Sequence, residues 1–133
     1  MDELQDQQLI SVIGVEGVER LVAAFYRQVP ADDILGPMYP PDDLVGAEER
    51  LRLFLIFRFG GSREYLQRRG HPQLRMRHAP LAVTQAARDR WMLLMNRAID
   101  ECGFNETAQS VLRSFLGSVA TFLINRDPHR NQP

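Results

Sequence analysis

The sequence predicts an all-α fold of about four substantial helices with a long irregular insert in its second half. Apolar residues recur at helical spacing along most of the chain, and no run of alternating apolar and polar residues indicates a β-strand. The chain has 133 residues, of which 44% are hydrophobic and 25% charged, an ordinary globular composition. We therefore expect residues 1–133 to form one domain, with a disordered tail at about 127–133.

The first helix is predicted from apolar residues at the spacing of one helix face, namely Val18, Leu21, Val22, Phe25 and Val29. Pro30 closes this helix because proline disfavours helical geometry in the residue before it. Tyr26 interrupts the apolar spacing, which indicates that its hydroxyl faces a polar group. A short turn-rich segment then follows, with Gly36-Pro37 and Pro40-Pro41.

Asp42 or Asp43 is the expected cap of a second helix, which continues to about Phe57. Its apolar residues extend beyond one stripe and comprise Leu44, Ala47, Leu51, Leu53, Phe54, Leu55, Ile56 and Phe57. A helix with so wide an apolar surface must be covered on more than one side. Gly60-Gly61 is expected to end it.

Residues 62–81 are polar and contain the turn-forming residues Gly70, Pro72 and Pro80. They are predicted to form a loop with short helical turns, and an irregular stretch of about twenty residues in so small a domain is often functional. Thr84 is the expected cap of a third helix that reaches Cys102, where Gly103 is a stop signal. Apolar spacing predicts a fourth helix over about 108–123.

Composition disfavours several functional classes. A net charge of −1 gives no overall attraction to nucleic acid or anionic lipid. The densest apolar run, residues 53–57, is too short to span a bilayer, and the polar N-terminus does not resemble a signal peptide. Cys102 is the only cysteine, which excludes an internal disulfide and fits a reducing compartment. We expect a cytoplasmic protein with neither a membrane nor a nucleic-acid partner.

The chemistry that the residues permit centres on histidine. No nucleotide-binding glycine motif, Gly-x-Ser-x-Gly elbow or His-Glu-x-x-His motif occurs, so no catalytic residue is proposed. His71 and His78 lie in the insert without cysteine or carboxylate at zinc-ligand spacing, and His129 lies in the polar tail. One imidazole is enough for a haem iron, and arginines flank His78. From these residues alone, His78 is either a haem ligand or an ordinary loop histidine.

The insert contains the run His71-Pro-Gln-Leu-Arg-Met-Arg-His78-Ala-Pro80, and Trp91 follows it. Phe25-Tyr26, Met38-Tyr39-Pro40, residues 42–52 and Gly60-Gly61 complete a pattern that spans about residues 12–125. This pattern resembles the group II truncated haemoglobins of the globin superfamily. Two departures are visible: Gly14-Val15 replaces a frequent glycine pair, and Leu81 stands where close relatives often carry phenylalanine.

The resemblance implies a truncated globin fold, a two-over-two helical sandwich around haem b, with His78 as the iron ligand through Nε2. Its Nδ1–H would need an acceptor, and the carbonyl of Leu74, four residues earlier, is the candidate if this segment is helical. Tyr26, Tyr39 and Trp91 match the family's distal cage of hydrogen-bond donors. Helical spacing alone allows Trp91 to be a core residue instead.

The resemblance also implies a set of haem contacts. Ala47 stands where many globins carry a histidine, and alanine cannot donate a hydrogen bond. The implied contacts with the haem face are Phe25, Leu44, Ala47, Leu51, Phe54, Leu55, Leu74 and Met95. The candidates for the propionates are Arg50, Tyr65, His71, Arg75 and Arg77, with Arg77 and His71 first.

Three functions follow as alternatives. The first is reversible binding of O₂, CO or NO with slow release, since two donors at about 1 kcal/mol each would slow release roughly 30-fold. The second is a haem redox enzyme, peroxidase-like or a nitric oxide dioxygenase, which would need an external reductase. The third is a haemless helical module that binds a partner. The physiological ligand and the oligomeric state, including a possible oligomer, stay open.

Overall fold

The computed structural model describes residues 4–79 and 81–126, so Pro80 and the predicted tail at 127–133 lie outside the described part. A short turn, η1 (Asp6–Gln8), precedes α1 (Ile10–Gln28), and η2 (Gly36–Met38) and η3 (Pro41–Asp43) precede α2 (Leu44–Arg58). The insert holds α3 (Glu64–Arg69) and α4 (Leu74–Arg77). The last two helices are α5 (Gln85–Cys102) and α6 (Glu106–Phe122).

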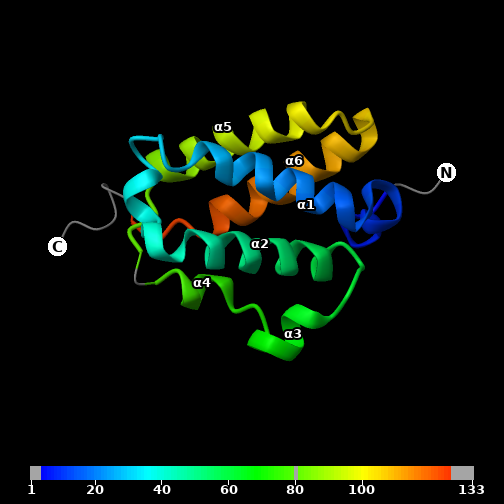
Figure 1. Ribbon diagram of the computed structural model, residues 1–133, viewed down its shortest axis with the longest axis horizontal. Helices are drawn as coiled ribbons and strands as arrows, with labels where there is room; N and C mark the ends of the chain where they lie inside the picture. The colour runs from blue at the N-terminus through cyan, green and yellow to red at the C-terminus, as the bar shows by residue number, and fades with distance from the viewer. Residues whose placement is uncertain (1–3, 80, 127–133) are drawn as a thin grey trace.

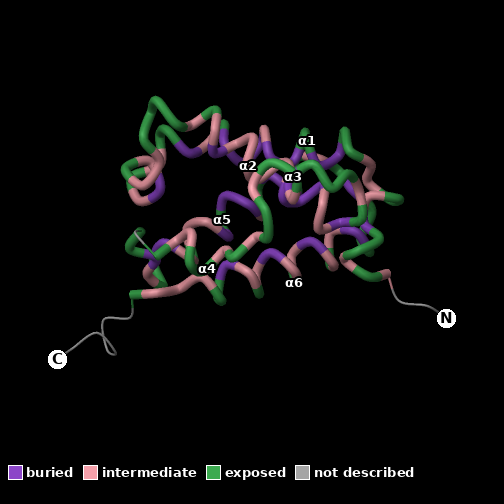
Figure 2. Tube along the Cα trace, turned by 90° about the horizontal axis from the view of Figure 1, so that it is seen from below, coloured by how far each residue is buried: buried purple, intermediate pink, exposed green. Residues whose placement is uncertain are grey.

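The predicted all-α fold is confirmed. Within the described ranges no β-strand forms, and Thr84 and Arg126 make only an isolated bridge. Helix α1 packs against α2 and α5, and α5 packs against α6, so two helix pairs form two layers (Figure 1). The view from below separates α2 and α3 on one side from α4 and α6 on the other (Figure 2).

Helix capping was predicted correctly for α5, whereas for α2 the prediction gave the N-cap residue but not the absence of its cap hydrogen bond. The Thr84 hydroxyl accepts a hydrogen bond from the Ala87 N–H at 3.0 Å, and Gly103 ends α5 with φ +69°. Asp43 stands at the N-cap position of α2 but makes no cap hydrogen bond. Its carboxylate is bound instead to the Arg50 guanidinium, at 2.6 Å. This competing ion pair is the physical reason why the cap hydrogen bond is absent.

Helix α2 is covered on more than one side, as its wide apolar surface predicted. Leu55 is fully buried in the core, and Phe54 and Ile56 are nearly so. Helix α3 covers a second side, because the Tyr65 ring packs against Phe54 and Phe57 with centroid distances of 5.6 and 6.5 Å. The first part of the insert, helix α3, therefore packs against α2.

Gly60 allows the N-terminal turn to lie against the end of α2. The Ile10 N–H donates to the Phe59 carbonyl at 2.9 Å, and Gly60 itself has φ +99°. A Cβ at this position would collide with the backbone carbonyl oxygen of Gln7. This approach requires a residue without a side chain.

We expect Gly60→Ala to lower the free energy of unfolding by at least about 1–3 kcal/mol, because it adds backbone strain and a steric clash. Gly103→Ala is the matched control, since Gly103 also has positive φ but a Cβ there meets no atom within 4 Å. Urea unfolding of both variants measures the difference. Equal losses of unfolding free energy in the two variants would show that the clash with Gln7 does not contribute to the destabilisation.

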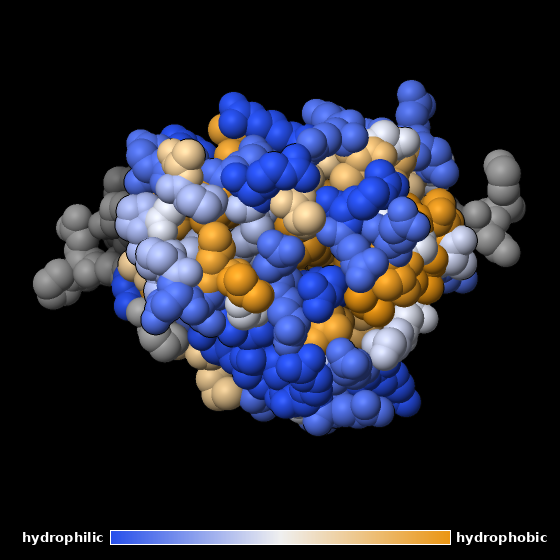
Figure 3. Space-filling view, in the orientation of Figure 1, coloured by the Kyte–Doolittle hydropathy of each residue, from blue (hydrophilic) through white to orange (hydrophobic). Residues whose placement is uncertain are grey.

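The large apolar side chains that remain exposed are distributed over several helices. They include Val45 on α2, Met76 on α4, Leu93 on α5 and Phe122 on α6. Figure 3 shows one face of the molecule, mostly hydrophilic, with separate hydrophobic patches. Among the described helices, none combines the length and apolar character that crossing a membrane requires.

Candidate functional site

His78 lies directly after α4, and its ring is oriented by the preceding helical turn. The ring Nδ1 lies 2.8 Å from the Leu74 carbonyl oxygen, the partner expected from the four-residue spacing. The same oxygen accepts the His78 backbone N–H at 3.0 Å. With Nδ1–H donating to a carbonyl, Nε2 carries the free lone pair and is the nitrogen available to a metal.

The segment after His78 is tied to the end of the chain by Asn125. The Asn125 amide donates to the His78 carbonyl at 3.0 Å and accepts the Val83 N–H at 2.9 Å. The sequence analysis did not single out Asn125, because the partners lie 47 and 42 residues away and no local pattern marks them.

Tyr26, Tyr39 and Trp91 come together from three separate elements. Tyr26 belongs to α1, Tyr39 follows η2, and Trp91 belongs to α5. The two tyrosine rings meet edge to face, with centroids 5.6 Å apart. The Tyr39 side chain lies within interaction distance of both the Tyr26 hydroxyl and the Trp91 indole. The three residues therefore form one connected polar group, which we call the distal cage.

Burial keeps both cage tyrosines protonated. It raises the pKa of Tyr26 far above its ordinary value, and the neighbouring Tyr39 side chain raises it further. Burial also raises the pKa of Tyr39, and this increase is partly offset by the neighbouring Tyr26 and Trp91 side chains. Both hydroxyls thus remain O–H groups at neutral pH and can donate.

The fully buried Phe25 supports the distal cage from the core side. Its ring centroid lies 5.0 Å from that of Tyr26, edge to face, and 5.2 Å from that of Trp91. Trp91 itself is only partly buried. Trp91 therefore packs against the core and is also partly exposed. This position lies between the two predicted alternatives, a core tryptophan and a residue of the distal cage.

Most cationic residues proposed for the propionates already have partners. Arg77 donates to the Pro72 carbonyl at 2.8 Å and to the Arg69 carbonyl at 2.6 Å, so it helps to shape the insert. Arg75 lies over the Phe122 ring at 5.7 Å. Arg50 holds Asp43, while His71 is exposed and Tyr65 is buried.

Arg69 is a cationic residue that was not among the residues predicted for the propionates. Its Nε is buried and, among the described residues, has no hydrogen-bond partner. The hydrogen bond from Arg50 holds the pKa of Asp43 below its usual range, and the positive charge of Arg69 lowers it further. Arg69 therefore lies near the Arg50–Asp43 pair. An unpaired buried guanidinium nitrogen is a candidate for an anionic group.

The expected haem contacts differ in burial. Phe25, Leu55 and Met95 are fully enclosed by the core, Ala47 and Phe54 are nearly buried, and Leu44, Leu51 and Leu74 are half-buried. A hollow of about 660 Å³ adjoins Leu74 and is lined on α6 by Val111, Phe115, Val119 and Phe122. Its lining includes neither His78 nor the distal cage. It therefore adjoins the predicted haem contacts only through Leu74.

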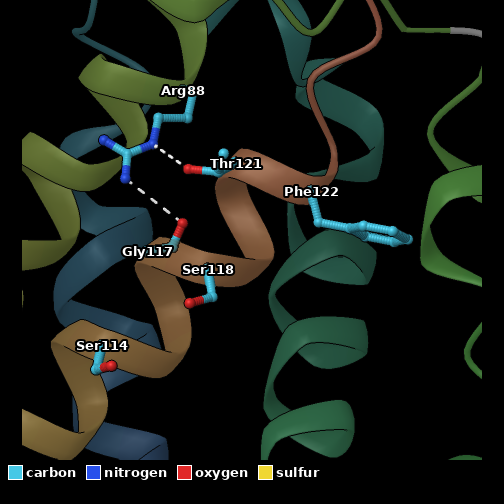
Figure 4. Close-up of a pocket in the computed structure, with 6 residues that line it drawn as sticks. All are labelled: Arg88, Ser114, Gly117, Ser118, Thr121 and Phe122. Carbon is cyan, nitrogen blue, oxygen red and sulfur yellow. Dashed lines mark hydrogen bonds between the residues drawn. The ribbon is translucent and has the colours of Figure 1, made fainter.

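A second hollow lies along α6 where Arg88 of α5 reaches it, and none of the predicted site residues lines it (Figure 4). The Arg88 guanidinium donates to the Thr121 hydroxyl at 3.1 Å and to the Gly117 carbonyl at 3.4 Å. Phe122 points away from this guanidinium (Figure 4). The polar groups of this hollow thus serve to join α5 to α6.

A family model described as bacterial-like globin matches residues 9–125. The chain is also 32% identical over 114 residues to the group 2 truncated hemoglobin YjbI of Bacillus subtilis, with 86% of each protein covered. The chain belongs to the group II truncated haemoglobins. Membership in this family implies a haem-binding globin and small gaseous ligands such as O₂.

Solved structures of other truncated haemoglobins share the fold. A thermostable hemoglobin from Thermobifida fusca is 43% identical, with a TM-score of 0.85 and coverage of 89% of this chain and 97% of that chain. The truncated oxygen-avid haemoglobin from Bacillus subtilis is 31% identical, with a TM-score of 0.84 and coverage of 89% and 99%. The predicted truncated globin fold is therefore confirmed.

The residues of this truncated haemoglobin fit a haem. His78 offers an oriented imidazole with a free Nε2, and α2 and Leu74 offer half-buried apolar side chains. Arg69 offers a buried cationic nitrogen without a partner among the described residues. These are the three kinds of group that haem requires from a protein: an axial ligand, an apolar wall and a counter-charge for its carboxylates.

Proposed function

We propose that this truncated haemoglobin binds O₂ reversibly at a haem b held by His78 and releases it slowly. The observation that carries the proposal is the distal cage, in which three donors, Tyr26, Tyr39 and Trp91, lie close together. The likeness to the oxygen-avid haemoglobin of Bacillus subtilis supports it.

On the proximal side, His78 would hold the haem through Nε2. The hydrogen bond from Nδ1 to the Leu74 carbonyl fixes the tautomer and the ring orientation, and it increases the basicity of Nε2. Half-buried apolar residues of α2, among them Leu44 and Leu51, would cover the opposite face. Haem supplies, when bound, the iron at which a diatomic ligand binds.

On the distal side, Tyr39 is the donor that we assign to the ligand. Because the indole N–H of Trp91 can only donate, the nearby Tyr39 oxygen would be the acceptor of any hydrogen bond between them. The Tyr26 O–H can donate to the same oxygen, an orientation that agrees with the effect of each tyrosine on the other, which raises the pKa of Tyr26 and lowers that of Tyr39. The O–H of Tyr39 is then free to donate to a bound ligand, and Ala47 offers no competing donor.

For the haem carboxylates we propose Arg69 together with the residues that the sequence suggested. Arg50 can exchange its exposed bond to Asp43 for a propionate, since both partners of that ion pair are accessible. Arg77 keeps the insert in shape through the Pro72 and Arg69 carbonyls. Its hydrogen bond to the Arg69 carbonyl helps to fix the end of α3, where Arg69 lies.

The O₂ dissociation rate tests the proposal. We expect Tyr39→Phe and Trp91→Phe each to accelerate O₂ release about fivefold, the factor that corresponds to about 1 kcal/mol for one hydrogen bond. Stopped-flow replacement of O₂ by CO measures this rate. Leu93→Ala, on the exposed side of the same helix as Trp91, is the control and should leave the rate unchanged. Unchanged rates in both cage variants would overturn slow release through this cage.

A further inference from the structure

Asp32 is a nearly buried carboxylate in the segment that leads from α1 to Tyr39. Its side chain is 8% exposed, whereas that of the adjacent Asp33 is 83% exposed. Aspartate is rarely this buried unless its charge has partners. Arg90 of α5 supplies one partner, because its Nη1 lies 2.7 Å from Asp32 Oδ1 and 2.6 Å from Asp33 Oδ1.

The second oxygen of Asp32 organises the segment itself. Asp32 Oδ2 accepts the Ile34 N–H at 3.0 Å and the Leu35 N–H at 2.8 Å. The Asp32 carbonyl also accepts the Gly36 N–H at 2.9 Å, and the Gly36 carbonyl accepts the Tyr39 N–H at 3.2 Å. Hydrogen bonds to the carboxylate and to the main-chain carbonyl of Asp32 thus extend along the segment as far as the backbone of Tyr39.

Arg90 connects the same carboxylate to the other half of the distal cage. It is the residue immediately before Trp91 on α5, so its guanidinium attaches that turn of α5 to the segment that carries Tyr39. The buried Leu35 packs in the core within this segment. Arg27 and Glu101 join α1 to α5 as well, at 2.8 Å, but both of these side chains are more than half exposed.

We propose that Asp32 and Arg90 are positioning residues that hold Tyr39 against the indole of Trp91. They touch neither haem nor ligand in this proposal and act only through the cage. The expected effect of this pair on O₂ release rests on the proposed function. The expected effect on the position of Trp91 does not depend on it.

Two variants and one control test the pair in the haem-loaded protein. Asp32→Asn removes the negative charge of the side chain that organises the segment. Arg90→Gln removes the ion pair to α5 but leaves the hydrogen bonds from the Ile34 and Leu35 N–H groups to Asp32 in place. Arg27→Gln breaks the exposed ion pair between α1 and α5. Trp91 is the only tryptophan, so the indole bands of the ultraviolet resonance Raman spectrum report its N–H hydrogen bond alone.

We expect Asp32→Asn and Arg90→Gln to shift the indole band toward a weaker hydrogen bond and to accelerate O₂ release about fivefold, with unchanged haem content. Arg27→Gln should change neither quantity. An unshifted indole band in Arg90→Gln overturns the positioning role, because that variant keeps the segment's own hydrogen bonds. If Tyr39→Phe and Trp91→Phe both leave O₂ release unchanged, the proposed function fails, and the indole band still decides whether Asp32 and Arg90 position the cage.

Discussion

Replacing His78 by alanine is expected to weaken haem binding by more than about 100-fold, since loss of the outer hydrogen-bond partner of a ligand alone typically costs about 10–100-fold. His78→Ala removes the free Nε2 that the Leu74 carbonyl orients. The measurement is the visible absorption spectrum of the ferric and the reduced protein, before and after addition of CO. The unmodified protein should show an intense Soret band that shifts with CO.

His71→Ala is not a neutral control for this test, because His71 is a propionate candidate. Gln85→Ala, exposed near the start of α5, serves better. Added imidazole should restore part of the absorption of His78→Ala, because it can occupy the space of the missing ring. A protein that stays colourless after addition of haemin would overturn the haem proposal and favour the haemless helical module.

Replacing Phe25 by alanine is expected to lower the free energy of unfolding by about 3–5 kcal/mol, the usual cost of emptying a buried phenylalanine site. Phe25 is fully buried and contacts the rings of both Tyr26 and Trp91. Urea unfolding with linear extrapolation measures the loss. Phe25→Leu retains most of the volume and should lose less.

Phe122→Ala is the matched control for Phe25, because Phe122 is 57% exposed and its ring lies under the Arg75 guanidinium, 5.7 Å away. We expect this variant to lose only about 0.5–1 kcal/mol. Equal losses at the two positions would contradict the assignment of Phe25 to the core. In Phe25→Ala the rings of Tyr26 and Trp91 lose their shared support, so O₂ release should also accelerate.

The long helices were predictable because their information is local. Apolar residues repeat at helical spacing, and Thr84 and Gly103 act on neighbouring backbone groups. The missing cap hydrogen bond of α2 was not predictable. The Asp43 carboxylate could accept from either the helix N–H groups or Arg50, and only the folded structure shows that it binds Arg50. The short helices of the insert were expected as turns, but the left-handed Gln73 before α4, with φ +43°, has no pattern that marks it.

The candidate site was predictable only in part. The bond between His78 and the Leu74 carbonyl follows from helical spacing, whereas the grouping of Tyr26, Tyr39 and Trp91 was implied by family resemblance alone. Arg77 was one of the two residues predicted first to bind the haem propionates, yet it donates hydrogen bonds to two carbonyl groups of the insert. Asp32 and Arg90 lie 58 residues apart, and a charged pair at that distance in the chain leaves no trace in local spacing.

The hydrogen bonds of Asn125 make the two ends of this chain unequal for protein engineering. Asn125 holds the carbonyl of His78 and the N–H of Val83, so force applied at the C-terminal side is transmitted to the backbone of the proposed iron ligand. At the other end, the turn η1 contacts α6 and the end of α2, on the side of Arg58 and Phe59. A pulling force from a fusion partner or surface linker joined before η1 therefore acts on the packed helices. The same force applied close after Asn125 acts on the backbone of His78.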